Sequence, residues 1–165
     1  MKRIMAAGLW TVFVMSLALG YGCGGASPTA PRTGFTLGGK TYTEKYTCNE
    51  QFGGVPPTTC PDLNEVDVII FQSTGANTVV GYDVPDTGYV YTGTRTGDVL
   101  NWTAISPLGY TEAGTWTFSP DGSTFSGTSH YVANAPGIYA GDCTTNGVLG
   151  SGSTPPDPPL PTGCP

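Results

Sequence analysis

Charged residues are scarce in this chain of 165 residues. Asp, Glu, Lys and Arg together make up 11 % of it, and Lys and Arg account for only six residues. A protein that binds nucleic acid needs a basic surface to neutralise phosphates, so we expect no nucleic-acid partner. The formal net charge of −6 also argues against electrostatic docking on anionic lipid.

Signatures of catalysis and of metal binding are also missing. The chain has one histidine, His130, and no Gly-x-Ser-x-Gly segment of the kind that presents a serine nucleophile. It has no Cys-x-x-Cys pair for zinc. Asp62 to Asp67 places oxygen atoms at alternate positions but lacks the glycine and the terminal glutamate of an EF-hand loop. We therefore expect no enzymatic activity, no cofactor and no metal, and we predict that His130 lies on the surface.

Helical spacing is absent, and the apolar residues recur with a period of two. Leu100, Trp102 and Ala104 alternate with polar residues, as do Trp116 and Phe118. Such alternation predicts strands with one buried face. Val68 to Phe71 is apolar at every position, which predicts a central strand or one covered on both faces.

Glycine (25 residues) and proline (15 residues) punctuate these strands. Pro120-Asp121-Gly122 between Thr115–Ser119 and Thr124–Val132 is a strong hairpin signal, and Thr96-Gly97-Asp98 marks another turn. Short strands joined in sequence by short turns form an antiparallel meander. We predict an all-β domain over residues 34–149, with about eight strands closed into a small barrel; a β-sandwich is the alternative.

Gly93 to Trp102 and Trp116 to Thr128 loosely resemble the hairpins of lipocalin- and avidin-type barrels in their short strands, Gly-rich turns and inward aromatics. The resemblance concerns fold style alone. Independently of the resemblance, a barrel can hold a small apolar ligand or a glycan in its mouth, and this is an alternative function. The candidate contact residues are Tyr89, Tyr91, Trp102 and Trp116.

The first 22 residues have the organisation of a secretory signal peptide. Lys2 and Arg3 precede an apolar stretch from Ile4 to Leu19, which is too short to span a bilayer comfortably, and small residues lead to Cys23. Gly22-Cys23 resembles the lipobox of bacterial lipoproteins, although Gly20 and Tyr21 depart from the preferences of that family. The resemblance implies that the Cys23 thiol carries a lipid and becomes the new N-terminus. Ordinary cleavage near Gly22, without a lipid, is the alternative.

The expected mature chain begins and ends in segments that are poor in strand signals. Residues 23–33 are rich in Gly, Ser, Thr and Pro and read as a flexible linker between the anchor and the domain. Residues 150–165 form a proline-rich tail that we expect to be extended or disordered. Gly24 follows Cys23, and by resemblance to enterobacterial lipoproteins this favours an outer-membrane or cell-surface location.

Setting Cys23 aside leaves Cys48, Cys60, Cys143 and Cys164, an even number that favours two disulfides in an exported chain. Three pairings are open. We favour Cys48 with Cys60 and Cys143 with Cys164, because both would close local loops.

These observations favour a non-enzymatic lipoprotein of the cell envelope that displays a β domain for binding or assembly. The partner would be an envelope protein or a glycan. The second hypothesis is a barrel that holds a ligand, and the third is a small hydrolase that uses carboxylates or His130.

The lipid predicts a direct result. A radiolabelled fatty acid such as palmitate should be incorporated into the chain in its native host, and Cys23→Ala should abolish the label. Label that persists in the Cys23 variant, or that never appears in the native chain, would contradict the anchor.

Overall fold

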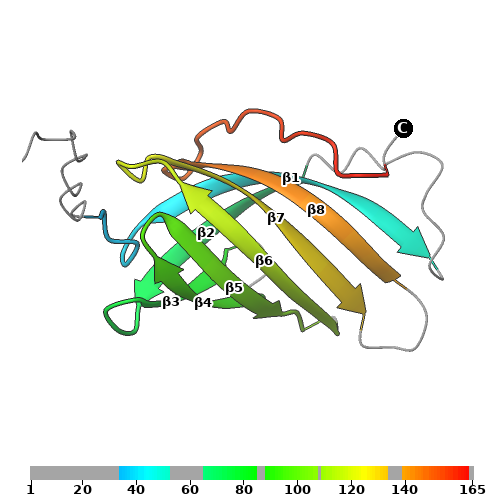
Figure 1. Ribbon diagram of the computed structural model, residues 1–165, viewed down its shortest axis with the longest axis horizontal. Coiled ribbons are helices and arrows are strands. Elements are labelled where there is room, and N and C mark those ends of the chain that lie inside the picture. The colour runs from blue at the N-terminus through cyan, green and yellow to red at the C-terminus, as the bar shows by residue number, and fades with distance from the viewer. Residues whose placement is uncertain (1–33, 53–64, 85–87, 108, 134–138, 164–165) are drawn as a thin grey trace, which may run out of the picture. The chain divides into compact units, whose positions relative to one another are not determined.

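The computed structural model describes residues 34–52, 65–84, 88–107, 109–133 and 139–163. Strands alone make up its regular structure, and they form one closed barrel in sequence order, as predicted, rather than a sandwich (Figure 1). The strands are β1 (Thr41–Phe52), β2 (Glu65–Ser73), β3 (Thr78–Asp83), β4 (Val90–Thr96), β5 (Val99–Ile105), β6 (Tyr110–Phe118), β7 (Thr124–Ala133) and β8 (Tyr139–Leu149). Among the described residues there is no helix that could cross a bilayer.

The predicted hairpin turn between β6 and β7 is present. Gly122 has a φ of 69°, a left-handed value that glycine adopts without strain. The Asp121 carboxylate accepts hydrogen bonds from the Ser119 hydroxyl (2.7 Å) and the Ser123 amide (3.0 Å). These bonds favour the ionised form and lower the pKa of Asp121 to about 2.

The barrel closes where β8 pairs with β1 along its whole length, from Tyr42 opposite Leu149 to Phe52 opposite Tyr139. Following directly opposed residues from Thr41 through β2 to β8 leads back to Gln51, ten residues further along β1. The strands are therefore tilted against the barrel axis. A barrel of eight strands is just wide enough for side chains to fill.

Large aromatic side chains fill the barrel by packing on glycines of the neighbouring strand. A Cβ on Gly114 would lie 2.5 Å from Cζ2 of Trp102, and one on Gly127 would lie 2.5 Å from Cδ1 of Trp116. In each case the aromatic residue and the glycine are directly opposed in the register. These opposed pairs are Trp102–Gly114, Trp116–Gly127, Phe125–Gly147, Tyr131–Gly141 and Phe71–Gly81. These five glycines stand inside strands, where they make room for the core.

The end of the barrel where β1 begins is apolar. Tyr42 lies among Phe71, Phe118 and Phe125, with ring centroids 5.5–5.8 Å away. Leu37, which precedes β1, is 2 % exposed and belongs to the same core. Phe35 packs on Phe118, and the Arg95 guanidinium lies 3.8 Å from the centroid of the Phe35 ring. The segment before β1 thus covers this end of the core.

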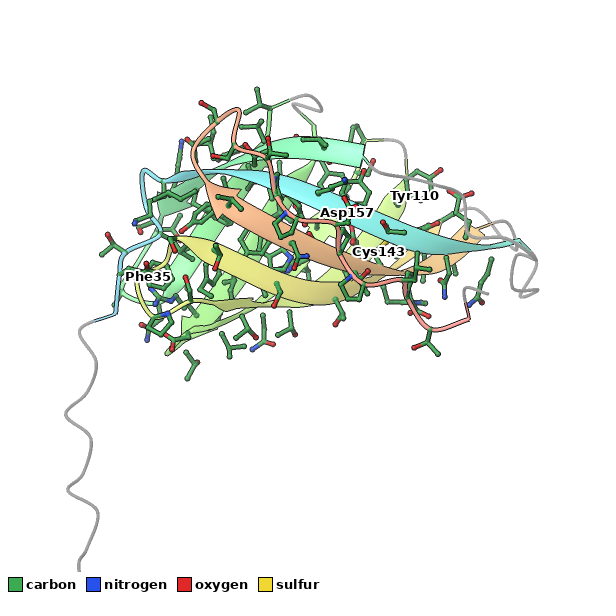
Figure 2. All side chains as sticks on the ribbon, turned by 90° about the horizontal axis from the view of Figure 1, so that it is seen from above. Phe35, Tyr110, Cys143 and Asp157 are labelled. Atoms are coloured by element: carbon green, nitrogen blue, oxygen red, sulfur yellow. A yellow bond between two sulfur atoms is a disulfide. The ribbon has the colours of Figure 1, made fainter. Side chains whose placement is uncertain are left out.

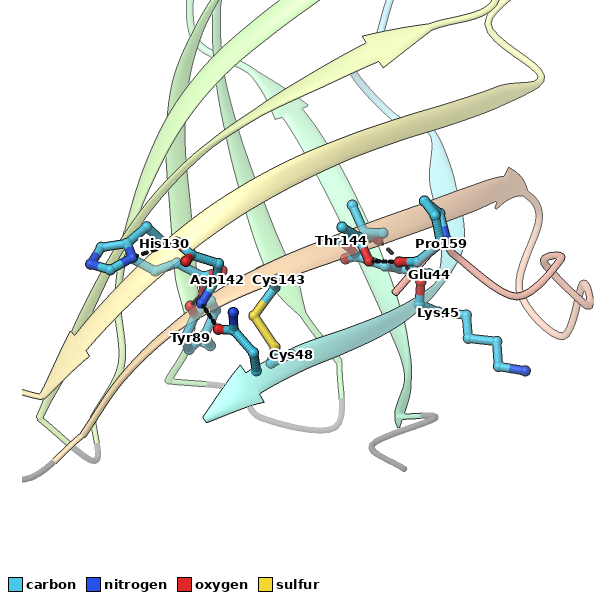
Figure 3. The surroundings of a disulfide bond; sticks show 12 residues. Glu44, Lys45, Cys48, Tyr89, His130, Asp142, Cys143, Thr144 and Pro159 are labelled. Carbon is cyan, nitrogen blue, oxygen red and sulfur yellow. Dashed lines mark hydrogen bonds and ion pairs between the residues drawn. A yellow bond between two sulfur atoms is a disulfide. The ribbon is translucent and has the colours of Figure 1, made fainter. Parts of the chain in front are cut away.

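The favoured disulfide pairing is wrong. Cys48 is bonded to Cys143, which lies directly opposite it on β8, with 4.0 Å between the two Cα atoms (Figure 3). The bond joins the first strand to the last and links residues 95 apart, which in the loop-entropy account stabilises the fold by about 4–5 kcal/mol. Local spacing could not reveal this pairing, because barrel closure brings distant positions together. Cys60 and Cys164 lie outside the described residues.

Of the two alternatives for the apolar run in β2, a central strand is confirmed, because β2 pairs with β1 and β3, and a strand covered on both faces is wrong. Ile69 and Phe71 point into the barrel and are fully buried, whereas Ile70 is 39 % exposed on the outer face and Val66 is exposed as well. Ile70 belongs to an outward row that crosses neighbouring strands through Tyr82, Val90 and Ile105. An all-apolar run therefore marks an exposed apolar row here rather than a second covering layer.

The C-terminal tail is extended and lies against the barrel. Beyond Gly150 it forms no strand, yet Pro155, Pro158 and Pro161 are buried. It runs over the outer face of β8 and β1 (Figure 2), held by hydrogen bonds from Asn146 and other side chains of these strands. We call residues 154–162 the strap.

The packing of aromatic rings on glycine predicts a stability loss. Gly127→Ala should lower the free energy of unfolding by about 1–3 kcal/mol or more, because the new methyl group would meet the Trp116 ring and the Thr115 carbonyl. Urea unfolding with the disulfide intact measures the change. Ser126→Ala, at the neighbouring exposed position, is the matched control and should stay within about 0.5 kcal/mol of the native value. Equal stability of the two variants would contradict the packing.

Candidate functional site

The four predicted ligand-contact residues lie together, but they form part of the core. Ring centroids are 5.0 Å apart for Tyr89 and Tyr91, 5.0 Å for Tyr91 and Trp102, and 4.7 Å for Trp102 and Trp116. Tyr91, Trp102 and Trp116 are only 6 %, 4 % and 1 % exposed, while Tyr89 is half-buried. Three of the four thus pack on one another and are closed off from solvent.

The other end of the interior is acidic, a feature that we did not predict. Glu44 points inward from β1 and is buried, and the Thr145 hydroxyl of β8 donates a hydrogen bond to its carboxylate. Burial raises the pKa of Glu44 to about 8; the Thr145 hydrogen bond opposes this rise, and the neighbouring carboxylates of Glu112, Asp67 and Asp83 add to it. Glu44 therefore holds its proton at neutral pH.

Asp83 of β3 is buried like Glu44, and Glu112 of β6 is a half-buried carboxylate at the same end. The Tyr89 hydroxyl donates a hydrogen bond to it. Burial raises the pKa of Glu112, against a hydrogen bond from Ser129 that lowers it. The four carboxylates do not form a metal site, since the described residues contain no cluster of ligands able to hold a metal ion. Asp62, the first residue of the segment compared with an EF-hand loop, lies outside the described residues.

A groove of about 620 Å³ lies on the outer face of β5 to β8, beside the strap. Pro161 and Thr162 of the strap form one of its sides. The polar side chains in the rest of its wall are those of Asn101, Thr115, Thr128, Ser129, His130, Asp142 and Thr144. A smaller groove of about 290 Å³ meets the strap at Pro156 and is lined by Thr117, Ser126 and Asn146 among others. Open grooves thus flank the strap near both of its ends.

His130 lies on the surface as predicted, and the structure gives it a partner. Its Nδ1 atom is 2.8 Å from Oδ1 of Asp142, the residue opposite it on β8, and both side chains are about half exposed (Figure 3). Asn49 of β1 holds the Asp142 backbone, since its side-chain oxygen accepts the Asp142 amide at 2.6 Å. A histidine oriented by a carboxylate is two thirds of a hydrolytic triad. No hydroxyl joins it among the hydrogen bonds found in the described ranges.

The sequence contained a partial signal for this groove. Three outward threonines are aligned by the register across the neighbouring strands β6, β7 and β8: Thr115, Thr128 and Thr144. The period-two pattern of the sequence predicts only that these three threonines face solvent. Their alignment, and the strap beside them, depend on strand pairing that a single sequence does not give.

No protein-family model matches the chain, and a search of curated proteins finds no relative. The site is therefore interpreted from its own geometry.

The buried carboxyl of Glu44 predicts a pH-dependent stability. The pKa of Glu44 is about 8 in the folded chain and 4.5 in the unfolded chain. Between pH 4.5 and pH 8 the carboxyl ionises readily only in the unfolded chain, so the free energy of unfolding of the wild type falls as the pH rises through this range. Glu44→Gln removes this loss and keeps an acceptor for Thr145. Thermal melts should give the Glu44→Gln variant nearly the wild-type free energy of unfolding near pH 4.5. By pH 8 the variant should be more stable than wild type by on the order of a few kcal/mol.

The control for this experiment is Asp98→Asn, a carboxylate-to-amide change in the β4–β5 turn. The melting-temperature difference between Asp98→Asn and wild type should not grow from pH 4.5 to pH 8 as that of Glu44→Gln does. A melting-temperature difference for Glu44→Gln that is constant across the pH range would contradict the assignment of a buried, proton-holding carboxyl.

Proposed function

We propose that this chain is an exported lipoprotein, anchored through Cys23, whose barrel is a non-enzymatic binding domain that uses its outer face. The observation that carries the proposal is the pair of grooves beside the strap. The leader and Gly22-Cys23 support export and the anchor. The location that follows is the cell envelope, on the outer membrane or the cell surface.

The filled interior argues that binding takes place outside the barrel. Aromatic rings seat on glycines across the middle of the barrel, and Trp116 and Phe71 are almost completely buried. The interior beyond them is lined by buried carboxyls such as Glu44. An apolar ligand would have to displace packed rings or desolvate these acids, at a cost in free energy. The outer grooves need no such rearrangement.

The chemistry of the larger groove indicates an uncharged, extended partner. Its only acidic side chain, Asp142, is engaged by His130, and its other polar groups are hydroxyls and amides. Such groups select ligands through hydrogen bonds rather than through charge. A protein segment that exposes its backbone meets this description.

A glycan is the second candidate. The Thr115 hydroxyl and the Asn101 side-chain oxygen are 3.0 Å apart on the exposed face, and paired hydroxyl and amide groups suit the hydroxyls of a neutral sugar. The aromatic residue in the groove lining, Trp102, is 4 % exposed and offers no open stacking face. This favours the protein partner over the sugar.

The test uses the full mature chain with Cys23→Ala, so that binding is separated from the anchor. The chain should co-sediment with cell envelopes of its own source, and Thr128→Arg should weaken this at least tenfold by filling the groove. Thr92→Arg, on the outer face of β4 and outside the groove lining, is the matched control and should bind as the parent does.

Protease treatment of the envelopes should remove the binding, whereas periodate treatment should do so only for a glycan partner. Equal binding by the Thr128 and Thr92 variants would contradict the role of the groove. Hydrolysis of a substrate by the purified chain that His130→Ala abolishes would contradict the non-enzymatic assignment.

A further inference from the structure

The strap has the three-residue burial pattern expected of a polyproline II helix. Pro155, Pro158 and Pro161 are buried, while the residues between them are exposed. A polyproline II helix has three residues per turn, so residues three apart lie on one face. The strap therefore presents one proline face to the barrel and the remainder to solvent.

Side chains of β1 and β8 donate hydrogen bonds to the strap backbone. Asn146 donates to the carbonyls of Pro156 (3.3 Å) and Asp157 (3.2 Å), Thr144 to that of Pro159, and Asn49 to that of Thr162 (2.5 Å). Polyproline II has no internal hydrogen bonds, so its carbonyls are free to accept them. The donors follow one another along the strap, which matches an extended chain rather than a turn.

The donors are held in place before any chain arrives. The side-chain oxygen of Asn49 accepts the Asp142 amide, which orients its NH₂ group toward the strap. Figure 3 shows Thr144 of β8 pointing to Pro159, on the same stretch of sheet as the disulfide that ties β8 to β1. A covalently fixed pair of strands is a rigid platform for such donors, and rigidity lowers the entropy lost on binding.

The contacts do not depend on features unique to this tail. Most are made to backbone carbonyls and to proline rings, which any proline-rich segment offers. Lys45 and Asp157 add one ion pair, so the site favours an acidic residue next to the central proline. The grooves beside Pro156 and beside Pro161 leave the flank of the strap open to an incoming chain.

The connection from β8 to the strap can act as a hinge. Gly150 and Gly152 have φ values of 107° and 78°, and the turn between β8 and the strap is closed by the Ser153 hydroxyl on the Leu149 carbonyl (2.9 Å). A short glycine-containing turn keeps the tail near its site at an effective concentration in the millimolar range. It also lets the tail leave without disturbing β8.

We propose that the outer face of β1 and β8 is a recognition site for proline-rich extended segments, held by the chain's own strap and open to a proline-rich segment of a partner protein in its place. This inference rests on the proposed binding function and names the partner class. The envelope experiment tests whether the groove serves binding at all. The peptide experiment below tests the strap face alone, so the two can fail separately.

The experiment uses the full-length mature chain with a released tail, Pro155→Ser, Pro158→Ser and Pro161→Ser, which leaves β1 and β8 unchanged. The probe is a fluorescein-labelled peptide of residues 154–163. It should bind the released chain at least tenfold more tightly than the wild-type chain, where the strap competes. Adding Asn146→Ala and Thr144→Val to the released chain should weaken binding at least tenfold.

Two controls make the result specific. The same peptide with its prolines replaced by serine should bind at least tenfold more weakly, and Thr92→Arg in the released chain should leave binding unchanged. Peptide binding that is indifferent to the Asn146 and Thr144 changes, or that is absent from the released chain, would overturn the proposal.

A second measurement covers the case in which the released chain is unfolded. Millimolar unlabelled peptide added to the isotope-labelled wild-type chain should move the backbone amide signals of the strap residues Asp157 and Leu160 toward the positions of an unbound tail, because the peptide displaces the strap. Signals that stay in place would overturn the proposal.

Discussion

Pairing of the first strand with the last is the constraint on which the remaining structure depends. The β1–β8 ladder turns a meander into a closed cylinder of eight strands, leaving space inside for side chains and little more. The interior must then combine large and small residues in register, which is why rings such as Trp102 and Trp116 face glycines. The same ladder places Cys48 opposite Cys143, so that a covalent bond fixes the seam from the inside.

The seam is also covered from the outside. The strap crosses β8 and β1 over the face opposite the disulfide, and Thr47 and Asn49 are buried although they point away from the core. Barrel closure, disulfide and strap therefore stabilise the same two strands. A seam secured in this way is a rigid surface, and a rigid surface with aligned donors loses little entropy when it binds a chain.

The barrel has carboxyl groups in part of its interior and an uncharged polar surface on part of its exterior. Glu44 and Glu112 lie within the barrel, while the outer faces of β6 and β7 carry threonines such as Thr115 and Thr128. The buried acids remain compatible with the fold because they are hydrogen-bonded and the protonated form of Glu44 is favoured at neutral pH. The uncharged exterior makes hydrogen bonding the means by which that face would select a partner.

Period-two patterning and turn chemistry determined the fold class, the approximate number of strands, the β6–β7 hairpin and the exposed position of His130. These are local properties, because alternation and a Pro-Asp-Gly turn act within a few residues. The leader and the lipid site at Cys23 are predictions that rest on the sequence alone. The Cys48–Cys143 bond, the aromatic-on-glycine core, the His130–Asp142 pair and the docked strap were decided by tertiary structure. Each joins residues on different strands or segments, and only the register of a closed barrel defines which of them meet.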